Sequence, residues 1–262
     1  CQFNVVDNKE KNIENATSMI LKAVKQNADF IVLPEMFNCP YSNEKFIEYC
    51  EEETHSPTLS KIAKLANENN TYILAGSIPE KEGSKIFNTS YLFDKNGEII
   101  AKHQKMHLFD IDVKGKIYFK ESDTLSSGNK VTIAKTDFGK VGIGICYDIR
   151  FPEWVRTQMA QGVKVLFVVA QWPEPRVQQW EILLKARAVE NQAFIVAVNR
   201  VGTGPDDVFS GHSMVIDPLG NVVLQSKEHE EGIFTADINL EEVDKVRGQI
   251  PVFEDRRTDL YH

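Results

Sequence analysis

The sequence predicts an α/β fold with mixed sheets, arranged as one domain over residues 1–262. Helical periodicities alternate with short, continuous apolar runs near both ends of the chain, and such runs are typical of buried strands. In the middle, paired strand-like segments flank turn sequences, which indicates hairpins. The sequence contains no fixed-period repeat, low-complexity segment or linker, so we expect no division into separate domains.

Four elements are predicted in the first third of the chain. Residues 12–26 place apolar side chains on one helical face, and residues 59–66 do the same. Residues 30–33 form a short apolar run that ends at Pro34, which predicts a buried strand. Residues 72–77 predict a second buried strand, so the chain begins with alternating helices and strands.

Hairpins follow, and then the alternation resumes. The predicted hairpins pair residues 89–93 with 99–102, 131–134 with 140–145, and 210–216 with 221–224, around turns that contain Asp and Gly. The other predicted elements are helices over 152–161, 178–190 and about 240–247, and buried strands over 165–170 and 194–199. The result is a mixed sheet system with helices before and after the hairpin-rich stretch.

Composition and charge limit the classes of function. Hydrophobic residues make up 42% and charged residues 26% of the chain, as in ordinary globular proteins. The net charge of −8 argues against nucleic acid as a partner, because an acidic surface repels phosphates. It leaves room for a small anionic ligand in a locally basic pocket. No stretch approaches the roughly 20 apolar residues of a membrane helix, and no signal peptide is visible, so we expect no membrane partner.

The four cysteines show no Cys-x-x-Cys pair and no Cys/His zinc spacing. So few cysteines in so long a chain predict a reducing compartment and a cytoplasmic location, without a disulfide framework. We interpret Cys39 and Cys50 as structural. Cys1 begins a strand-like segment without a start methionine, so we expect residues to precede it.

Cys146 is the strongest candidate nucleophile. It ends the apolar strand that starts at Val141, and Pro152 begins a helix soon after, so we expect the thiol at a sharp strand-to-helix turn. Backbone N–H groups there can face an oxyanion, and a helix start or a lysine would favour the reactive thiolate. The plain alternative is a buried cysteine that packs as a small hydrophobe. The charges at Asp148 and Arg150 argue against a plain core strand.

Glu35 is the candidate general base. It follows the buried strand over 30–33, at the edge where open α/β folds place ligands. Apolar neighbours desolvate a carboxylate and raise its pKa, so that it can act as a base and then as an acid near neutral pH. The alternative is a solvated loop glutamate. The neighbouring Leu33, Met36 and Phe37 argue against that alternative.

Lys105 lies in a basic stretch with His103 and His107. A lysine here can stabilise negative charge on a tetrahedral intermediate, but on these residues alone a solvated, basic strand end is the preferred interpretation. The two histidines are four residues apart, yet they lack the glutamate of a His-Glu-x-x-His zinc site and fall on strand and loop. The glycines over 139–144 have the wrong order for a dinucleotide fingerprint. We expect no metal and no cofactor.

Taken in order, these stretches resemble the nitrilase superfamily of carbon–nitrogen hydrolases, whose catalytic set is Glu, Lys and Cys. The matching segments are Leu33-Pro-Glu35, Gly76-Ser77, Asn88-Thr89, Lys105-Met-His-Leu108, Gly142 to Glu153, Ala186 to Asn191 and Gly211-His-Ser213. The resemblance spans essentially the whole chain. It implies a four-layer α-β-β-α sandwich and pairing of subunits, often as a homodimer.

The resemblance also implies roles for single residues. It assigns catalysis to Glu35, Lys105 and Cys146, with Lys105 and the backbone N–H after the cysteine stabilising the oxyanion. Glu121 matches a second glutamate, which orients the lysine and the substrate; otherwise it is a surface loop residue. His212, within one of the matching segments, we interpret as a packed or hydrogen-bonded strand residue.

Two segments look most like the omega-amidases, which hydrolyse the terminal amide of 2-oxoglutaramate and 2-oxosuccinamate. They are residues 109–122 and the tail over 250–261. Residues 170–176 instead resemble bacterial members more than animal ones. This segment belongs to the expected pocket wall, so it leaves the exact substrate open.

Such a substrate carries a carboxylate, which suits a guanidinium fork. Arg150 and Arg176 are therefore candidate substrate-binding residues, against the alternatives of a structural ion pair for Arg150 and solvent for Arg176. Tyr147, next to the nucleophile, and Trp172, as a pocket wall, complete the candidate substrate site.

Three alternative functions stay open. The same scaffold could hydrolyse deaminated glutathione, an N-carbamoyl amine or a nitrile. Cys1 could serve as an N-terminal nucleophile, although Cys146 has the better context. A catalytically silent binding protein is the third alternative, and the intact Glu, Lys and Cys set argues against it.

Overall fold

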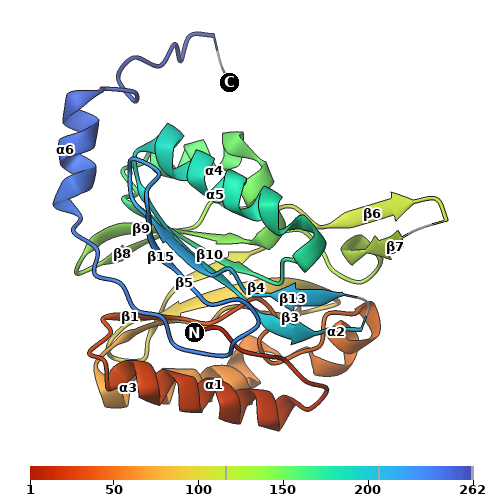
Figure 1. Cartoon of the computed structure of the whole chain (residues 1–262). Coiled ribbons are helices and arrows are strands. Elements are labelled where there is room, and N and C mark those ends of the chain that lie inside the picture. The colour runs from red at the N-terminus through yellow and green to blue at the C-terminus, as the bar shows by residue number, and fades with distance from the viewer. Residues whose placement is uncertain (116, 206, 261–262) are drawn as a thin grey trace.

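The computed structural model describes residues 1–115, 117–205 and 207–260, and two β-sheets lie face to face at its centre (Figure 1). The first sheet has the order β1 (Phe30–Val32), β2 (Tyr72–Leu74), β4 (Lys85–Phe93) and β3 (Ile78–Glu82), with β5 (Ile99–Gln104) also paired to β4. The second has the order β15 (Val222–Gln225), β14 (Met214–Ile216), β11 (Phe194–Asn199), β10 (Val165–Ala170), β9 (Gly139–Ile145) and β8 (Ile133–Thr136). Two small hairpins pair β6 (Asp110–Val113) with β7 (Ile117–Lys120) and β12 (Val201–Thr203) with β13 (Val208–Ser210).

Helices cover the outer face of each sheet. Figure 1 shows α1 (Lys9–Val24) and α3 (Pro57–Asn69) below the first sheet, and α4 (Pro152–Met159) and α5 (Val177–Asn191) above the second. The chain also forms α2 (Asn43–Tyr49) before α3, and α6 (Glu241–Gln249) near its C-terminal end. The four-layer α-β-β-α sandwich that the resemblance implied is confirmed.

The first helix shows how local sequence sets an element. Asn8 caps α1, since its side-chain oxygen accepts a hydrogen bond from the backbone N–H of Lys11, and the helix therefore begins before the predicted residue 12. Ala16, Ile20 and Ala23 are buried on one face, as their spacing requires. They pack into a core between α1, α3 and the first sheet, while a second core fills the space between the sheets and around α4 and α5.

The central strands of the second sheet position the site. β9, β10 and β11 run parallel, and every residue of β10 is buried, which fits the continuous apolar runs of the sequence. Parallel strands end at the same edge of a sheet. Cys146 follows β9, Gln171 follows β10 and Arg200 follows β11, so these residues are neighbours at that edge.

The predicted strand over 210–216 is wrong in one respect. It is split into the end of β13 and all of β14, because Gly211 and His212 have positive φ angles of 85° and 59°. A left-handed backbone breaks the period-2 pattern of a strand. His212 thus lies between strands, although it is packed and hydrogen-bonded, with Nδ1 2.9 Å from a carboxylate oxygen of Glu181.

Candidate active site

Cys146 lies at the strand-to-helix turn that the sequence predicted. β9 ends at Ile145, a 3-10 turn covers Cys146–Arg150, and Pro152 begins α4. Cys146 has φ of 45°, and a left-handed conformation costs a non-glycine residue about 1–3 kcal/mol. The side chain is buried, and its Sγ lies 4.0 Å from the backbone oxygen of Gln171. The turn therefore lifts the thiol out of the strand toward the neighbouring strand end.

Glu35 is completely buried, so it is not a solvated loop residue. It lies in the connection after β1, and residues of the next strand connection hold this segment in place. The Ser77 hydroxyl accepts a hydrogen bond from the N–H of Met36, at 2.9 Å, and the Ser77 N–H donates to the Pro34 oxygen, at 3.3 Å. Gly76 has φ of 47°, and a β-carbon there would come within 1.9 Å of the Pro34 oxygen. The Gly76-Ser77 pair thus supports the segment that carries Glu35.

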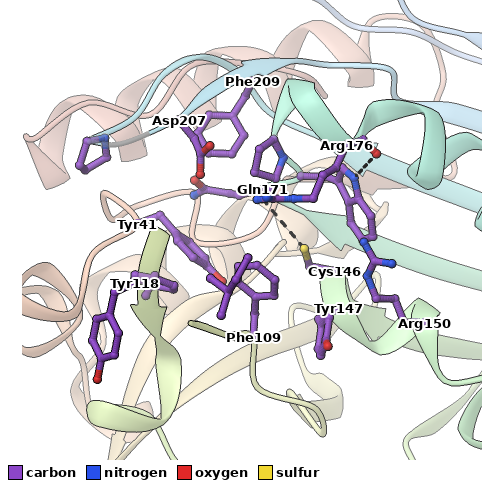
Figure 2. A pocket seen from close by; sticks show the side chains of 15 residues that line it. Tyr41, Phe109, Tyr118, Cys146, Tyr147, Arg150, Gln171, Arg176, Asp207 and Phe209 are labelled. Carbon is purple, nitrogen blue, oxygen red and sulfur yellow. Dashed lines mark hydrogen bonds between the residues drawn. The ribbon is translucent and has the colours of Figure 1, made fainter. Parts of the chain in front are cut away.

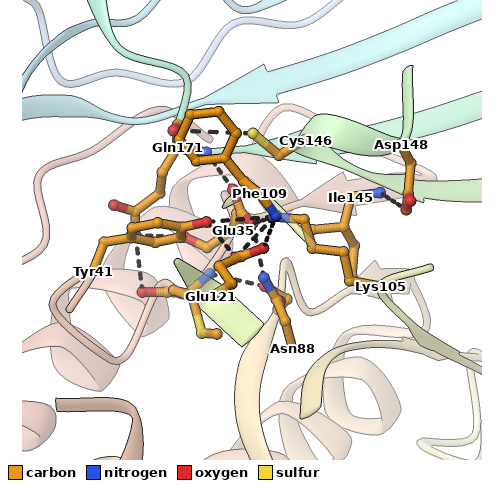
Figure 3. A network of polar contacts seen from close by, with 12 residues as sticks. Glu35, Tyr41, Asn88, Lys105, Phe109, Glu121, Ile145, Cys146, Asp148 and Gln171 are labelled. Carbon is orange, nitrogen blue, oxygen red and sulfur yellow. Dashed lines mark hydrogen bonds and ion pairs between the residues drawn. The ribbon is translucent and has the colours of Figure 1, made fainter. Parts of the chain in front are cut away.

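Each oxygen of the Glu35 carboxylate has protein partners (Figure 3). The Asn88 amide donates to Oε1 at 2.8 Å, and the Lys105 ammonium donates to the same oxygen at 3.0 Å. The backbone N–H of Gln171 donates to Oε2 at 2.7 Å. The carboxylate is therefore held in one orientation between the two sheets.

Lys105 follows β5 and is also completely buried, so the solvated strand end preferred from the residues alone is wrong. Its Nζ lies 3.0 Å from Glu35 Oε1, 2.9 Å from Glu121 Oε1 and 3.3 Å from the Tyr41 hydroxyl. An ammonium has three donors. These three oxygens account for all of them.

Glu121 starts a 3-10 turn and is buried, so the surface-loop alternative is wrong as well. Its Oε1 accepts from Lys105 and from the Tyr41 hydroxyl, and its Oε2 accepts from the Phe109 N–H at 2.6 Å. Figure 3 shows that the Glu121 and Glu35 carboxylates both contact the Lys105 ammonium. The arrangement is two carboxylates around one cation.

Burial and charge set the protonation of these groups. Burial disfavours the Lys105 ammonium, but the carboxylates of Glu121 and Glu35 outweigh it and hold the pKa of Lys105 above its usual range. Burial raises the pKa of Glu121, and Lys105 opposes the rise. Burial, followed by the charge of Glu35, raises the pKa of the Cys146 thiol well above its usual range. Lys105 favours the thiolate, as expected for a lysine, but burial and Glu35 outweigh it, so the thiol needs a proton acceptor as it reacts.

A cavity of about 370 Å³ opens beside the thiol (Figure 2). Cys146 and all four candidate substrate-binding residues line it: Tyr147, Arg150, Trp172 and Arg176. Aromatic side chains from the β6–β7 hairpin and its neighbours complete the wall, among them Phe109, Tyr118 and Phe119. Aromatic residues form much of the wall, and two guanidinium groups, one thiol and the residues Gln171 and Asp207 also line the space.

The two arginines are anchored differently. The Arg150 guanidinium lies 4.7 Å from the centre of the Trp172 ring and donates to the Gln179 side chain at 2.6 Å. Among the residues that the structure describes it forms no ion pair, so the ion pair considered as its alternative is wrong. Arg176 lies in a 3-10 turn, with its guanidinium 5.5 Å from the centre of the Phe109 ring. Both side chains are half-buried, so the solvent alternative for Arg176 is wrong.

Three residues contribute to the site although the sequence did not identify them as part of it. Tyr41 contacts both Lys105 and Glu121, and Gln171 holds Glu35 through its backbone N–H. Asn88 was noted within a matching segment, but its contact with Glu35 was not foreseen. The position of Gln171 directly after a buried strand was the available signal, since strand ends bear ligands in α/β folds.

Nothing in the described residues suggests a metal centre or a membrane segment. No group of three or more His, Cys, Asp or Glu there is arranged to hold a metal ion. Among the helices in the same residues, none has the length and apolar character needed to span a bilayer.

The family model and similar known proteins indicate the same family. The family model described as carbon-nitrogen hydrolase matches residues 1–248. The chain is 41% identical to a 2-oxoglutaramate amidase of Bacillus subtilis, over 99% of this chain and 97% of the relative, and 39% identical to human omega-amidase NIT2, over 99% and 94%.

A solved structure agrees with these relatives. Saccharomyces cerevisiae Nit3, a member of branch 10 of the nitrilase superfamily, superposes with a TM-score of 0.88 at 32% identity, over 98% of this chain and 94% of that one. The chain therefore belongs to the carbon–nitrogen hydrolases of the nitrilase superfamily, and it is a cysteine amidase that acts on non-peptide amides.

Proposed function

We propose that this amidase is an omega-amidase, which converts 2-oxoglutaramate or 2-oxosuccinamate into the 2-oxo dicarboxylate and ammonia. The observation that carries the proposal is the cavity, in which the Cys146 thiol and the guanidinium groups of Arg150 and Arg176 line one space. A short amide with a carboxylate at its other end suits such a space, because a guanidinium binds a carboxylate with two parallel hydrogen bonds. The printed names of the two relatives, a 2-oxoglutaramate amidase and an omega-amidase, support the same substrate class.

In the first half of the reaction, Cys146 Sγ attacks the amide carbon and its proton passes to Glu35. A hydrogen bond between thiol and carboxylate prepares this transfer, and the raised thiol pKa makes it necessary. Lys105 and the Tyr147 backbone N–H stabilise the oxygen that becomes negative. As the carbon–nitrogen bond breaks, Glu35 returns the proton to nitrogen, ammonia leaves, and a thioester remains on Cys146.

In the second half, water replaces ammonia. Glu35 accepts a proton from the water as its oxygen attacks the thioester carbon. The carbon–sulfur bond then breaks, the sulfur takes the proton back from Glu35, and the acid leaves. Glu121 keeps Lys105 oriented throughout, through the 2.9 Å contact between them.

The test is ammonia release from 2-oxoglutaramate, measured beside glutamine, deaminated glutathione and N-carbamoylputrescine, with Cys146→Ala as the control. We expect fast release from the 2-oxo acid amide that disappears in the variant. Activity on another of these compounds alone would keep the cysteine chemistry and reject the omega-amidase assignment. Mutation-insensitive release would reject the cysteine chemistry.

We further propose that the enzyme is a cytoplasmic, single-domain homodimer. An exposed apolar patch supports pairing: Ile182 and Val189 on the outer face of α5, and Leu219, Val222 and Val223 on the β14–β15 hairpin. The hairpin lies against the helix, since a β-carbon on Gly220 would come within 2.6 Å of Val189. Exposed apolar side chains that gather on neighbouring elements mark interfaces. Light scattering should give twice the chain mass for the wild type and the monomer mass for Ile182→Asp.

A further inference from the structure

Asp148, two residues after the nucleophile, carries a completely buried carboxylate. Its Oδ2 accepts from the Ile145 backbone N–H at 3.0 Å and lies 3.1 Å from His103 Nε2. Its Oδ1 accepts from the His107 backbone N–H at 3.0 Å and lies 2.8 Å from His107 Nδ1. An ionised carboxylate has about four acceptor sites, so these contacts occupy all of them. Because an ionised carboxylate can only accept, both histidines donate.

These contacts join the two segments of the site that must act together. Ile145 immediately precedes Cys146, so one oxygen holds the turn that carries the thiol. His103 and His107 stand two residues before and two residues after Lys105, so the same carboxylate holds the lysine segment on both sides. Figure 3 shows the hydrogen bond between Ile145 and Asp148 in the same view as Lys105 and Cys146. The geometry is a bridge between nucleophile and cation.

The surroundings make the bridge rigid. The His107 ring stacks on Phe151, with centroids 3.7 Å apart and planes 10° apart, and the His103 ring packs 5.4 Å from Trp154. Burial alone would raise the pKa of Asp148, but hydrogen bonds from His103 and His107 outweigh it, so its pKa lies below the usual range. The bridging carboxylate is therefore kept charged, and a charged acceptor makes stronger hydrogen bonds than a neutral one.

We propose that Asp148 is a positioning residue for acyl transfer: by bridging the Cys146 turn and the Lys105 segment, it sets the distance between the thiol and the ammonium. It touches neither the thiol nor the cavity. It therefore acts on the rate of thioester formation and leaves the affinity for the amide substrate nearly unchanged. The inference rests on the roles of Cys146 and Lys105 in the proposed function.

The first test is Asp148→Asn, which keeps the shape but turns one acceptor oxygen into an N–H donor that faces other donors. Misplacement of reacting groups by about 1 Å costs roughly 100-fold in rate, so we expect kcat to fall by about that factor while KM changes by less than about threefold. Asp137→Asn is the matched control, because Asp137 is an exposed carboxylate in the turn before β9, whereas Asp148 lies in the turn after it, and the change should leave both constants as they are. A raised KM with kcat intact would overturn the proposal.

A second arm needs no substrate turnover. Alkylation of Cys146 by iodoacetamide, followed by mass spectrometry of the cysteine peptide, should slow by about tenfold in Asp148→Asn, because the thiol loses its alignment with the Lys105 ammonium and with Glu35, which that ammonium holds. If the wild type fails to hydrolyse 2-oxoglutaramate, the proposed substrate fails, and this arm still decides the role of Asp148. Alkylation at the wild-type rate would overturn it.

A third variant separates positioning from mere stability. His107→Asn removes part of the bridge at a residue whose side chain is one-quarter exposed, so folding should survive even if Asp148→Asn unfolds. We expect the same pattern of lower kcat and constant KM, and a double variant no slower than Asp148→Asn alone, because both changes break one linkage. Multiplying effects, or a fall in melting temperature with wild-type kcat in His107→Asn, would show a structural role only.

Discussion

Lys105 and Glu35 form a fully buried ion pair, with 3.0 Å between Nζ and Oε1. The same ammonium lies 2.9 Å from Glu121, so two carboxylates share one cation. The charges of Glu35 and Glu121 oppose formation of a thiolate nearby. Proton transfer from the thiol to Glu35 avoids a second negative charge, and this favours a step in which attack and proton transfer are coupled.

Glu35→Gln tests this coupling. The amide has the shape of the carboxylate and can still accept from Lys105, but it cannot take a proton. Removing a general base costs about 10²–10⁴ in rate, so we expect kcat/KM for 2-oxoglutaramate to fall by at least about 100-fold. Glu44→Gln, on the exposed side of α2, is the control and should keep full activity. A Glu35 variant with more than a tenth of wild-type activity would remove the general base from the mechanism.

Lys105→Met tests how much the ion pair contributes to the fold. The change leaves two buried carboxylates without their cation, and breaking a buried pair typically destabilises a protein by about 3–5 kcal/mol. Urea unfolding followed by circular dichroism should show that loss. Lys61→Met, at an exposed position of α3, should stay within about 0.5 kcal/mol of the wild type. Equal stability of the two variants would mean that the carboxylates are not charged in the folded state.

Much of the fold could be predicted because buried strands appear in the sequence as continuous apolar runs. The bounds of β10 and β11 agree with the apolar runs over 165–170 and 194–199. The sequence did not reveal α2, which is only seven residues long, nor the β6–β7 hairpin, in which most residues of β6 are exposed. Elements without a buried periodic face carry no such pattern.

In the candidate site, too, some residues could be predicted from local sequence and others could not. Cys146 could be predicted from its local context, the end of an apolar strand before a helix. The contact between Glu35 and Gln171 joins residues 136 positions apart, and no local pattern encodes it. Lys105 was expected to be solvated for the same reason. Its two carboxylate partners come from distant segments, and without them a buried lysine is unfavourable.

The two arginines should control which amides are hydrolysed. Replacing a hydrogen-bonded charged partner costs about 1.5–3 kcal/mol, or roughly 10- to 100-fold. We expect Arg150→Met or Arg176→Met to lower kcat/KM for 2-oxoglutaramate by that factor. Hydrolysis of butanamide, which has no carboxylate, should change by less than about threefold, since no charged contact is lost. Equal losses on both amides would place the arginines outside carboxylate recognition.

Gly76→Ala should damage the site from a distance. A β-carbon at this position would meet the Pro34 oxygen at 1.9 Å, so the backbone next to Glu35 has to move. We expect kcat to fall by about 100-fold, the usual cost of displacing a reacting group by about 1 Å. Gly83→Ala is the matched control: its φ is 61°, yet nothing lies within 4 Å of the added carbon.

The control isolates the cost of the left-handed backbone, about 1–2 kcal/mol of stability without loss of rate. Steady-state kinetics and urea unfolding of both variants separate the two effects. If Gly83→Ala lowers kcat as much as Gly76→Ala, the contact with Pro34 is not what holds Glu35.

Asp148 should make stability depend on pH. The pKa of Asp148 in the folded protein lies below the usual value, whereas in the unfolded chain the pKa is about 3.9. Below that value the unfolded chain binds more protons than the folded one, so the contribution of Asp148 is complete above the unfolded pKa and is lost as pH falls toward the folded pKa.

Urea unfolding at pH 5.5, 4.5 and 3.5 should therefore show the difference in stability between wild type and Asp148→Asn shrinking at the lowest pH. Asp137→Asn should differ little from the wild type throughout, because its ion pair with Lys95 is exposed and such pairs contribute about 0–1 kcal/mol. A difference for Asp148→Asn that stays constant down to pH 3.5 would mean that the carboxyl has the same pKa in the folded and the unfolded chain, and a wild-type stability that rises relative to the variant as pH falls would mean that the carboxyl is neutral in the folded protein. Either result would rule out the charged bridge.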